Sequence, residues 1–249
     1  MIANISNQRN LQWSSGRSQS RRKTRMKFNN RLHAATLLLE KLLKFKSQNT
    51  VVLAIPRGAV PMGVYLSKGL NCSLGLVPVR KVASPLAPEF ALGAADVEGN
   101  FYPEDEDVLQ IPKEQLRLWL KKSLEVLRFR DFRWRKFVPR LALQNKVVII
   151  VDDGVATGAT MRAALMWVRR KQPAQIITAV PVASQEGLDM MHRFADAVEC
   201  LYAPADFGSV GEFYSAFQEV SDDDVCRLLT SLSAETDVTG TQPEGEPQK

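Results

Sequence analysis

The sequence is poor in the side chains that bind transition metals or form disulfides. Its 249 residues include only 3 cysteines and 2 histidines. Cys72, Cys200 and Cys226 stand far apart with no CxxC pair, which indicates reduced thiols in a reducing compartment, and we expect a cytoplasmic protein. Because His33 and His192 have no partner pattern around them, a histidine-ligated zinc site and a Ser-His-Asp triad are disfavoured.

Long apolar runs are also missing. No run in the sequence approaches the roughly 18 apolar residues of a transmembrane helix, so we expect no membrane partner. Hydrophobic residues still make up 45% of the chain, enough to bury a sizeable core, and 249 residues are an ordinary length for one domain.

Acidic residues are absent from the start of the chain. No Asp or Glu precedes Glu40, whereas eight Lys and Arg do. The remainder has 25 bases and 27 acids, a net charge of −2, so the formal charge of +6 comes from the N-terminal arm. Residues 1–25 are rich in Ser and Arg, which predicts a disordered basic arm. We expect the folded domain to span residues 26–232, and residues 233–249 to form a disordered tail.

Three interpretations of the arm stay open. It could contact nucleic acid, or it could be an organelle transit peptide, since these are Arg- and Ser-rich and poor in acids. Alternatively, Met26 could be the true start, because it leads directly into the first predicted helix. We favour a start at Met26. The native protein would then lack the basic arm, so we expect no nucleic-acid partner. Intact-mass spectrometry of the native protein should find an N-terminus near Met26, and a mass that includes residues 1–25 would contradict this.

The strongest chemical signal lies at residues 146–161, KVVIIVDDGVATGATM. Five branched apolar residues, 147–151, predict a strand that is buried on both faces of a parallel sheet. Asp152 and Asp153 follow it, and a Gly- and Thr-rich turn then opens a helical pattern at Met161. Since ligands of open α/β sheets bind beyond the carboxyl ends of the strands, we expect both acids in a binding site.

The turn itself has the properties of an anion site. Unpaired amides and the helix dipole attract anions, and Gly158 permits close backbone approach. The hydroxyls of Thr157 and Thr160 can donate to phosphate oxygens. Because Asp152 and Asp153 would repel an anion, they are expected to bind sugar hydroxyls or hydrated Mg²⁺. The pattern indicates a ribose 5-phosphate with a metal-bound pyrophosphate. The alternative is an acidic strand tip with an ordinary threonine N-cap.

Residues 148–160 resemble the binding fingerprint of type I phosphoribosyltransferases, which consists of four apolar residues, two acids and a TGxT loop. The resemblance implies that Asp152 and Asp153 hold the 2- and 3-hydroxyls of phosphoribosyl pyrophosphate (PRPP). The implied loop for its 5-phosphate consists of Ala156, Thr157, Gly158, Ala159 and Thr160.

A second buried strand is predicted over residues 50–55, and Pro56-Arg57-Gly58 follows it. In the family, a loop at this place cradles pyrophosphate, often with a cis peptide bond that does not precede proline. Arg57 would supply charge and a donor fork, and Gly58 would allow close backbone approach. The alternative is a strand-to-helix turn with a solvated arginine.

A third strand is predicted over residues 73–79, ending at Arg80 and Lys81. Residues 91–97 and 101–102 predict a hairpin arm. Many type I enzymes carry a basic pair before a mobile loop that closes over the reaction centre, and Arg80 and Lys81 match that pair by position. We therefore expect both to bind pyrophosphate. The alternative is a surface turn with two solvated bases.

The resemblance spans roughly residues 28–232 and is strongest to a subgroup of predicted phosphoribosyltransferases. It implies an α/β, type I phosphoribosyltransferase fold, with a central, mostly parallel sheet flanked by helices and a small hood. Alternating strand and helix patterns favour the same architecture. A homodimer is a further expectation from the family.

The implied activity moves ribose 5-phosphate from PRPP to an acceptor and releases pyrophosphate. Arg57, Arg80, Lys81 and Mg²⁺ would neutralise the leaving group. Asp152 and Asp153 would hold the ribose and stabilise its cationic C1, so the expected catalytic residues are these two acids and Lys81. We expect Mg²⁺ to bind through PRPP oxygens and water, without a direct protein ligand.

The acceptor is not identified by the sequence. Salvage enzymes for 6-oxopurines commonly have Asp where this chain has Ala156 and Glu where it has Asp152, which disfavours hypoxanthine and guanine. We expect a nucleobase-like acceptor in the hood, between a helix at residues 31–46 and a loop at 203–217. The aromatic residues that could stack on it, or pack in the core instead, are Phe207, Phe213 and Tyr214.

Residues 112–140 predict a basic helix, with ten Lys or Arg and three acids. Its expected apolar stripe consists of Leu116, Trp119, Leu120, Leu124, Leu127 and Phe129. The basic side is interpreted as a solvated face, with a rim for polyphosphate or RNA as the alternative.

Two functions of other classes stay open. The chain could be a PRPP- or nucleotide-binding regulator without turnover, or a protein that contacts nucleic acid through its basic arm.

Overall fold

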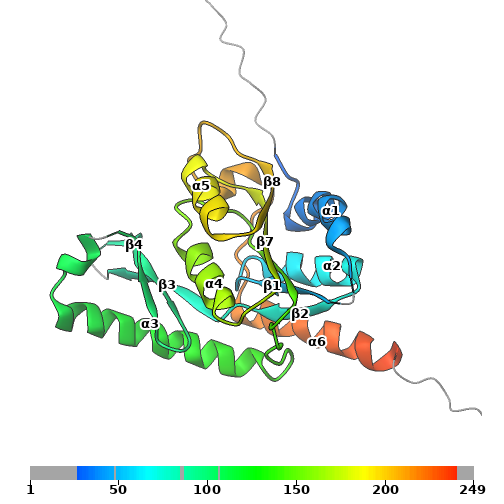
Figure 1. Ribbon diagram of the computed structural model, residues 1–249, viewed down its shortest axis with the longest axis horizontal. Helices are drawn as coiled ribbons and strands as arrows, with labels where there is room; N and C mark the ends of the chain where they lie inside the picture. Colours follow the sequence, from blue (N-terminus) through cyan, green and yellow to red (C-terminus); the bar gives the residue numbers. More distant parts are fainter. Residues whose placement is uncertain (1–26, 48, 85–86, 106, 240–249) are drawn as a thin grey trace, which may run out of the picture.

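A five-stranded parallel sheet forms the centre of the molecule (Figure 1). The computed structural model describes residues 27–47, 49–84, 87–105 and 107–239. In spatial order, the strands are β2 (Ser73–Leu76), β1 (Thr50–Ala54), β6 (Val147–Val151), β7 (Gln175–Val182) and β8 (Ala197–Tyr202). The sheet confirms the predicted strands at residues 50–55 and 147–151. The predictions for residues 1–25 lie outside the described residues.

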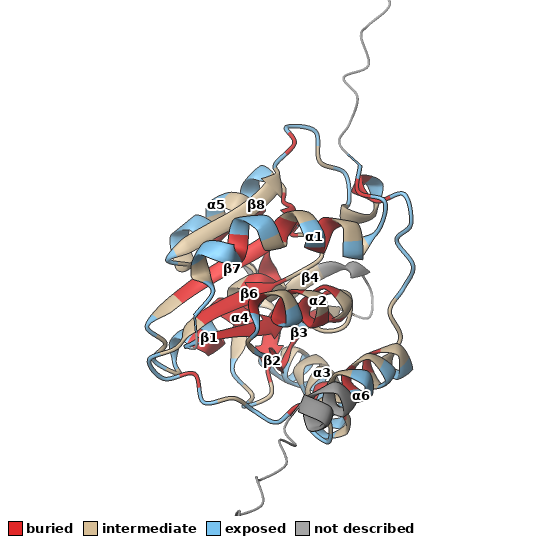
Figure 2. Ribbon diagram, turned by 90° about the vertical axis from the view of Figure 1, so that its right-hand side faces the viewer, coloured by how far each residue is buried: buried red, intermediate tan, exposed pale blue. Residues whose placement is uncertain are grey.

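Both faces of this sheet are buried, as the branched apolar run predicted. Alternate residues of β6 enter two hydrophobic clusters, with Ile149 and Val151 on one side and Val148 and Ile150 on the other. The first cluster packs under α1 (Arg31–Leu42), α2 (Val60–Leu70) and α6 (Asp222–Thr239), and the second under α4 (Ala159–Arg169) and α5 (Gln185–Phe194). Buried positions therefore follow the central strands and the inner helix faces in Figure 2. Each fully buried Ile or Leu contributes roughly 1.5–3 kcal/mol of transfer free energy.

The strand register brings two loops to one edge of the sheet. β1 and β6 pair in parallel from Thr50 opposite Val147 to Ala54 opposite Val151. Because both strands end together, the turn after Ala54 and the acids after Val151 emerge side by side.

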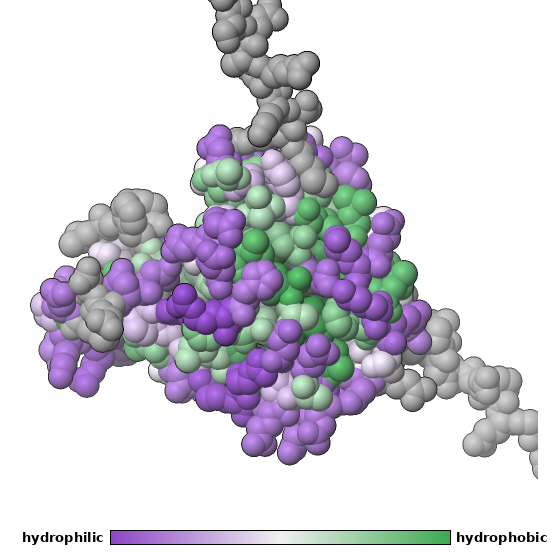
Figure 3. Space-filling view, turned by 45° about the horizontal axis from the view of Figure 1, so that its top comes forward, coloured by the Kyte–Doolittle hydropathy of each residue, from purple (hydrophilic) through white to green (hydrophobic). Residues whose placement is uncertain are grey.

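A smaller antiparallel sheet forms an arm to the left of the central sheet in Figure 1. It consists of β3 (Val79–Ser84), β4 (Ala87–Asp96) and β5 (Phe101–Pro103). The hairpin predicted across residues 98–100 is confirmed, and Gly99 takes the positive φ of 96° that this turn requires. In Figure 3, this side of the molecule is mainly hydrophilic, whereas hydrophobic side chains gather over the right half.

The prediction of one strand over residues 73–79 is wrong. β2 ends at Leu76, and Arg80 and Lys81 lie inside β3 of the arm instead of after a strand of the main sheet. Pro78 separates the two strands, because a residue without an N–H cannot continue a hydrogen-bonded ladder.

The long helix α3 (Lys113–Trp134) runs beside the arm and ends before the expected limit of Arg140. Leu127 and Trp134 are its buried residues, and Phe129, expected in the apolar stripe, is 62% exposed. At the other end of the chain, α6 continues to Thr239, beyond the predicted domain boundary at residue 232. None of the helices in the described ranges is long and apolar enough to cross a membrane.

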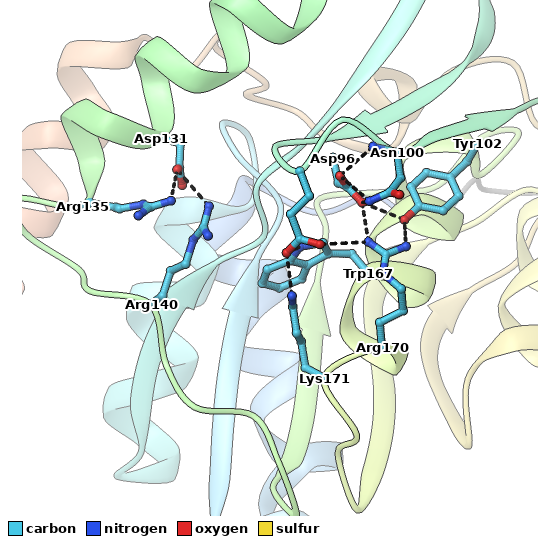
Figure 4. Close-up of polar contacts among 10 residues, drawn as sticks. Asp96, Asn100, Tyr102, Asp131, Arg135, Arg140, Trp167, Arg170 and Lys171 are labelled. Carbon is cyan, nitrogen blue, oxygen red and sulfur yellow. Dashed lines mark hydrogen bonds and ion pairs between the residues drawn. The ribbon is translucent and has the colours of Figure 1, made fainter.

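A buried carboxylate joins the arm to the segment that follows α4 (Figure 4). Asp96, at the end of β4, is fully buried and accepts hydrogen bonds from Tyr102 (2.7 Å), Asn100 (2.9 Å) and Arg170. Burial raises the pKa of Asp96, but the bonds from Tyr102, Arg170 and Asn100 together lower it below the usual value. Two residues further on, Glu98 of the hairpin accepts hydrogen bonds from Lys171 and, at 3.2 Å, from the indole of Trp167.

We predict that Arg170→Met lowers the free energy of unfolding by about 2 kcal/mol, because it leaves the buried Asp96 without its cation. Arg169→Met is the matched control, since Arg169 pairs with the exposed Asp196, and it should cost less than about 1 kcal/mol. Urea unfolding of both variants measures the difference. Equal losses would show that the Asp96 network does not hold the arm.

Candidate active site

Two adjacent carboxylates follow β6 at the sheet edge. The backbone N–H of Asp153 donates to Oδ1 of Asp152 at 2.9 Å. Arg31, the first residue of α1, donates from Nε and NH2 to Oδ2 of Asp153 at 2.9 and 2.7 Å. The hydroxyl of Tyr214 donates to the backbone carbonyl of Asp153 at 2.6 Å. Asp153 is thus fixed from both sides by residues far away in the sequence.

The environment of this pair favours the protonated acids. Burial, and then the neighbouring charge of Asp153, raise the pKa of Asp152 well above its usual value. Burial also raises the pKa of Asp153, although Arg31 opposes this. Only 14% of the Asp153 side chain is exposed. The pair therefore carries a free-energy cost at neutral pH that hydroxyl or cationic ligands would relieve.

The glycine-rich loop after the acids leaves the first backbone amides of α4 without a side-chain cap. Gly158 has a φ of 90°, which a residue with a side chain rarely adopts, and it caps α4 without any side-chain hydrogen bond. The helix begins at Ala159, two residues before the helical pattern predicted from Met161, and no side chain caps its first amides. On the other side, the hydroxyl of Ser184 donates to the carbonyl of Ala156 at 2.7 Å. A cavity of about 190 Å³ lies over this loop. Its lining includes Lys81, Asp152 and all residues from Gly154 to Met161.

The loop after β1 lies directly against the acids. Its Pro56–Arg57 peptide bond is cis, as the resemblance implied. A Cβ placed on Gly58 would lie 2.1 Å from Oδ2 of Asp153, so only glycine fits here. Arg57 donates to Glu219 at 2.7 Å, and Glu219 is 79% exposed.

A larger cleft of about 840 Å³ adjoins the loop cavity. Lys81, Asp152 and Thr160 line both. The predicted residues around the cleft are Arg57, Gly58, Arg80, Lys81, Asp152, Asp153 and Thr160. The structure thus brings every predicted site residue to one of two adjoining cavities, and Asp152 and Lys81 line both.

Several residues that line the cleft were not predicted from the sequence. Arg31 lines it, and its guanidinium lies 4.0 Å from the ring centroid of Phe217. Phe217 is 36% exposed, whereas Phe213 and Tyr214 are buried, so the latter two are core residues and not acceptor-stacking residues. Phe207 stacks on Phe213 with ring centroids 5.3 Å apart. No local pattern marks Arg31, because its partner lies 122 residues away.

Asp152→Asn should raise the free energy of unfolding near neutral pH by about 1 kcal/mol, although it removes a site residue. The folded protein binds a proton on Asp152 at pH values where the unfolded chain releases it, because the folded pKa is raised. Wild-type stability therefore falls as pH rises from about 4 through the folded pKa, and the variant avoids this loss.

Urea unfolding near pH 4 and near pH 7.5 tests this, with the exposed Asp189→Asn as control. A loss of stability near pH 7.5 in the Asp152 variant alone would contradict the account.

Comparison with known proteins relates this chain to a family. The sequence model of the phosphoribosyl transferase domain matches residues 29–208. A Mycobacterium tuberculosis protein, provisionally named a phosphoribosyl transferase, is 34% identical over 204 residues, which is 81% of this chain and 46% of that protein. A Chloroflexus aurantiacus protein named bifunctional protein PyrR is 36% identical over 106 residues, 42% of this chain and 53% of that protein. The chain thus spans about half the length of these curated relatives.

A solved structure agrees with this placement. A crystal structure of a Thermus thermophilus protein has a TM-score of 0.71 and 39% sequence identity to this chain. The match covers 84% of this chain and all of that one. With the fingerprint of residues 148–160 on the predicted parallel sheet, these matches confirm that the chain belongs to the phosphoribosyl transferase domain family.

Proposed function

We propose that this chain transfers the ribose 5-phosphate unit of PRPP to a nucleobase-like acceptor and releases pyrophosphate. The observation that carries the proposal is the order of groups in the two adjoining cavities. The loop with the uncapped helix amides lines one cavity, Asp152 and Lys81 line both, and Asp153, Arg57 and Arg80 line the other. A 5-phosphate, a ribose and a pyrophosphate occur in this order in PRPP.

In this mechanism, the loop Ala156–Thr160 binds the 5-phosphate through its amides and the hydroxyls of Thr157 and Thr160. Asp152 and Asp153 accept hydrogen bonds from the ribose hydroxyls. As C1 loses pyrophosphate it gains positive charge, and the nearby carboxylates stabilise that charge. Arg31 keeps Asp153 in place through two hydrogen bonds.

The leaving group departs toward the basic end of the cleft. Arg57 and Arg80, with Lys81, would stabilise the charge of released pyrophosphate. Lys81 lines both cavities, so its ammonium group can stay near the bond that breaks between ribose and pyrophosphate and stabilise the negative charge of the leaving group. The loop expected to close over the site includes residues 85–86, which lie outside the described residues.

Mg²⁺ fits this site as an ion that arrives with the substrate. Within the described ranges, no three His, Cys, Asp or Glu side chains gather as a candidate metal site, and the acids that line the cleft are Asp152, Asp153 and Glu219. Mg²⁺ would therefore take its ligands from substrate oxygens and water, as this ion commonly does. When bound, Mg²⁺ would neutralise charge on the pyrophosphate oxygens.

The acceptor side of the cleft is lined by Arg31, Phe217 and Gln218. The partly exposed ring of Phe217, already beside the Arg31 guanidinium, offers a face on which a planar acceptor can stack. Ala156 leaves no carboxylate where 6-oxopurine enzymes use one, so we propose an acceptor other than hypoxanthine or guanine.

The double variant Asp152→Asn/Asp153→Asn should weaken PRPP binding at least about 100-fold, because both ribose hydroxyls lose charged acceptors. Isothermal titration with PRPP and Mg²⁺ measures this, and Asp189→Asn on α5 is the control. Unchanged PRPP affinity in the double variant would contradict the assignment.

A pyrophosphate-release assay across an acceptor panel separates enzyme from regulator. Release with any acceptor supports the transferase. Tight PRPP binding without release would favour the alternative of a non-catalytic PRPP sensor.

A further inference from the structure

One face of α3 forms a wall of the large cleft. Ser123, Leu127, Arg130 and Trp134 line the cavity, and their spacing of four, three and four residues places them along a single helix stripe. The stripe thus carries a cation, Arg130, to the basic end of the cleft. No residue of this helix belongs to the fingerprint loops.

Arg130 lies close to the two arginines already assigned to that end. Its charge and that of Arg57 lower the pKa of Arg80, after the larger effect of burial. Three like charges around one cavity repel each other, and their main internal compensation is Asp222, 3.0 Å from Nε of Arg130 and 3.9 Å from Nε of Arg57. Such a cluster is stabilised by a ligand with several negative charges.

Two residues that line the cleft carry buried hydrogen-bond donors without partners. Nε of Arg80 and Nε1 of Trp134 are buried without a hydrogen-bond acceptor, and both residues line the cleft. Within the described part of the chain, Arg130 uses only Nε, which leaves its two terminal nitrogens without a hydrogen bond. Buried donors without partners are rare in native structures, and a ligand rich in acceptor oxygens would satisfy them.

The two acids near the cluster differ in how firmly they are held. Glu219, which pairs with Arg57, is 79% exposed, so the pair is weak and can yield to a ligand. Asp222 is 26% exposed and stands at the start of α6. Asp222 therefore fixes Arg130 in place, and the guanidinium ends remain available.

We propose that Arg130 of α3 is a further pyrophosphate-binding residue, which completes an arginine trio with Arg57 and Arg80 and is positioned by Asp222. The inference rests on the proposed function, because it assumes that pyrophosphate occupies this end of the cleft. It assigns α3 a part in binding the leaving group, and it explains why the helix presents a cation on its cleft face.

The test compares Arg130→Gln with wild-type protein in titrations of three probes: PRPP with Mg²⁺, pyrophosphate with Mg²⁺, and ribose 5-phosphate. The variant should bind the first two about 10- to 100-fold more weakly, because charge-assisted hydrogen bonds are lost. Its affinity for ribose 5-phosphate, which has no pyrophosphate, should stay within about twofold. Arg117→Gln, on the same helix and 78% exposed, is the matched control and should change none of the three.

Equal affinity of Arg130→Gln and wild type for pyrophosphate would overturn the inference and leave the proposed function intact. A similar loss for all three probes would also overturn it, because a general structural defect would explain that result. If wild-type protein binds neither PRPP nor pyrophosphate, the proposed function itself fails.

A second measurement needs no variant. A crystal structure of the wild-type chain with magnesium pyrophosphate should place an Arg130 guanidinium nitrogen about 3 Å from a pyrophosphate oxygen. Pyrophosphate bound elsewhere, or bound by Arg57 and Arg80 alone, would reject the role of Arg130.

Discussion

Two neighbouring carboxylates at the end of a buried strand impose the main constraint on this structure. Asp152 and Asp153 lie where burial favours the protonated acid, so the folded chain has to compensate for their charge. Arg31 of α1 donates two hydrogen bonds to Oδ2 of Asp153, and the hydroxyl of Tyr214 donates to the backbone carbonyl of Asp153. Gly58 leaves room for the carboxylate, since any Cβ there would overlap it. The first helix, the loop after β1 and the segment before α6 therefore converge on one acid pair.

The arm depends on a second buried acid of the same kind. Asp96 is fully buried and is satisfied by Arg170 beyond α4 and by Tyr102 and Asn100 within the arm (Figure 4). This network joins the antiparallel arm to the segment that follows α4. Because Arg80 and Lys81 belong to β3 of the same arm, the Asp96–Arg170 contact links these cleft residues to the segment after α4.

The features that were predicted correctly from the sequence are those that depend on residues close together in the chain. The run of residues 147–151 indicated the central strand because branched apolar residues without polar interruption suit a doubly covered sheet. The acids and the glycine loop after it were found together because the fingerprint is contiguous. The cis bond at Pro56–Arg57 followed from the resemblance, and the structure has it.

Features set by distant contacts could not be predicted in this way. Arg31 joins the site through a partner 122 residues away, and nothing in the residues around it indicates that partner. The face of α3 that lines the cleft could not be predicted from periodicity, because most of that helix is solvated. The predicted apolar stripe included Phe129, which is 62% exposed. Likewise, Phe213 is fully buried, with its ring against Tyr202 and Phe207 and its carbonyl accepting from the distant amide of Phe28, which a stacking interpretation could not anticipate.

The most direct test of the account is a crystal structure of this chain with PRPP and Mg²⁺. The account predicts the 5-phosphate on the amides of residues 156–160, the ribose hydroxyls on Asp152 and Asp153, and the pyrophosphate against Arg57 and Arg80. PRPP bound in the reverse direction, or in a cavity that excludes the two acids, would contradict it.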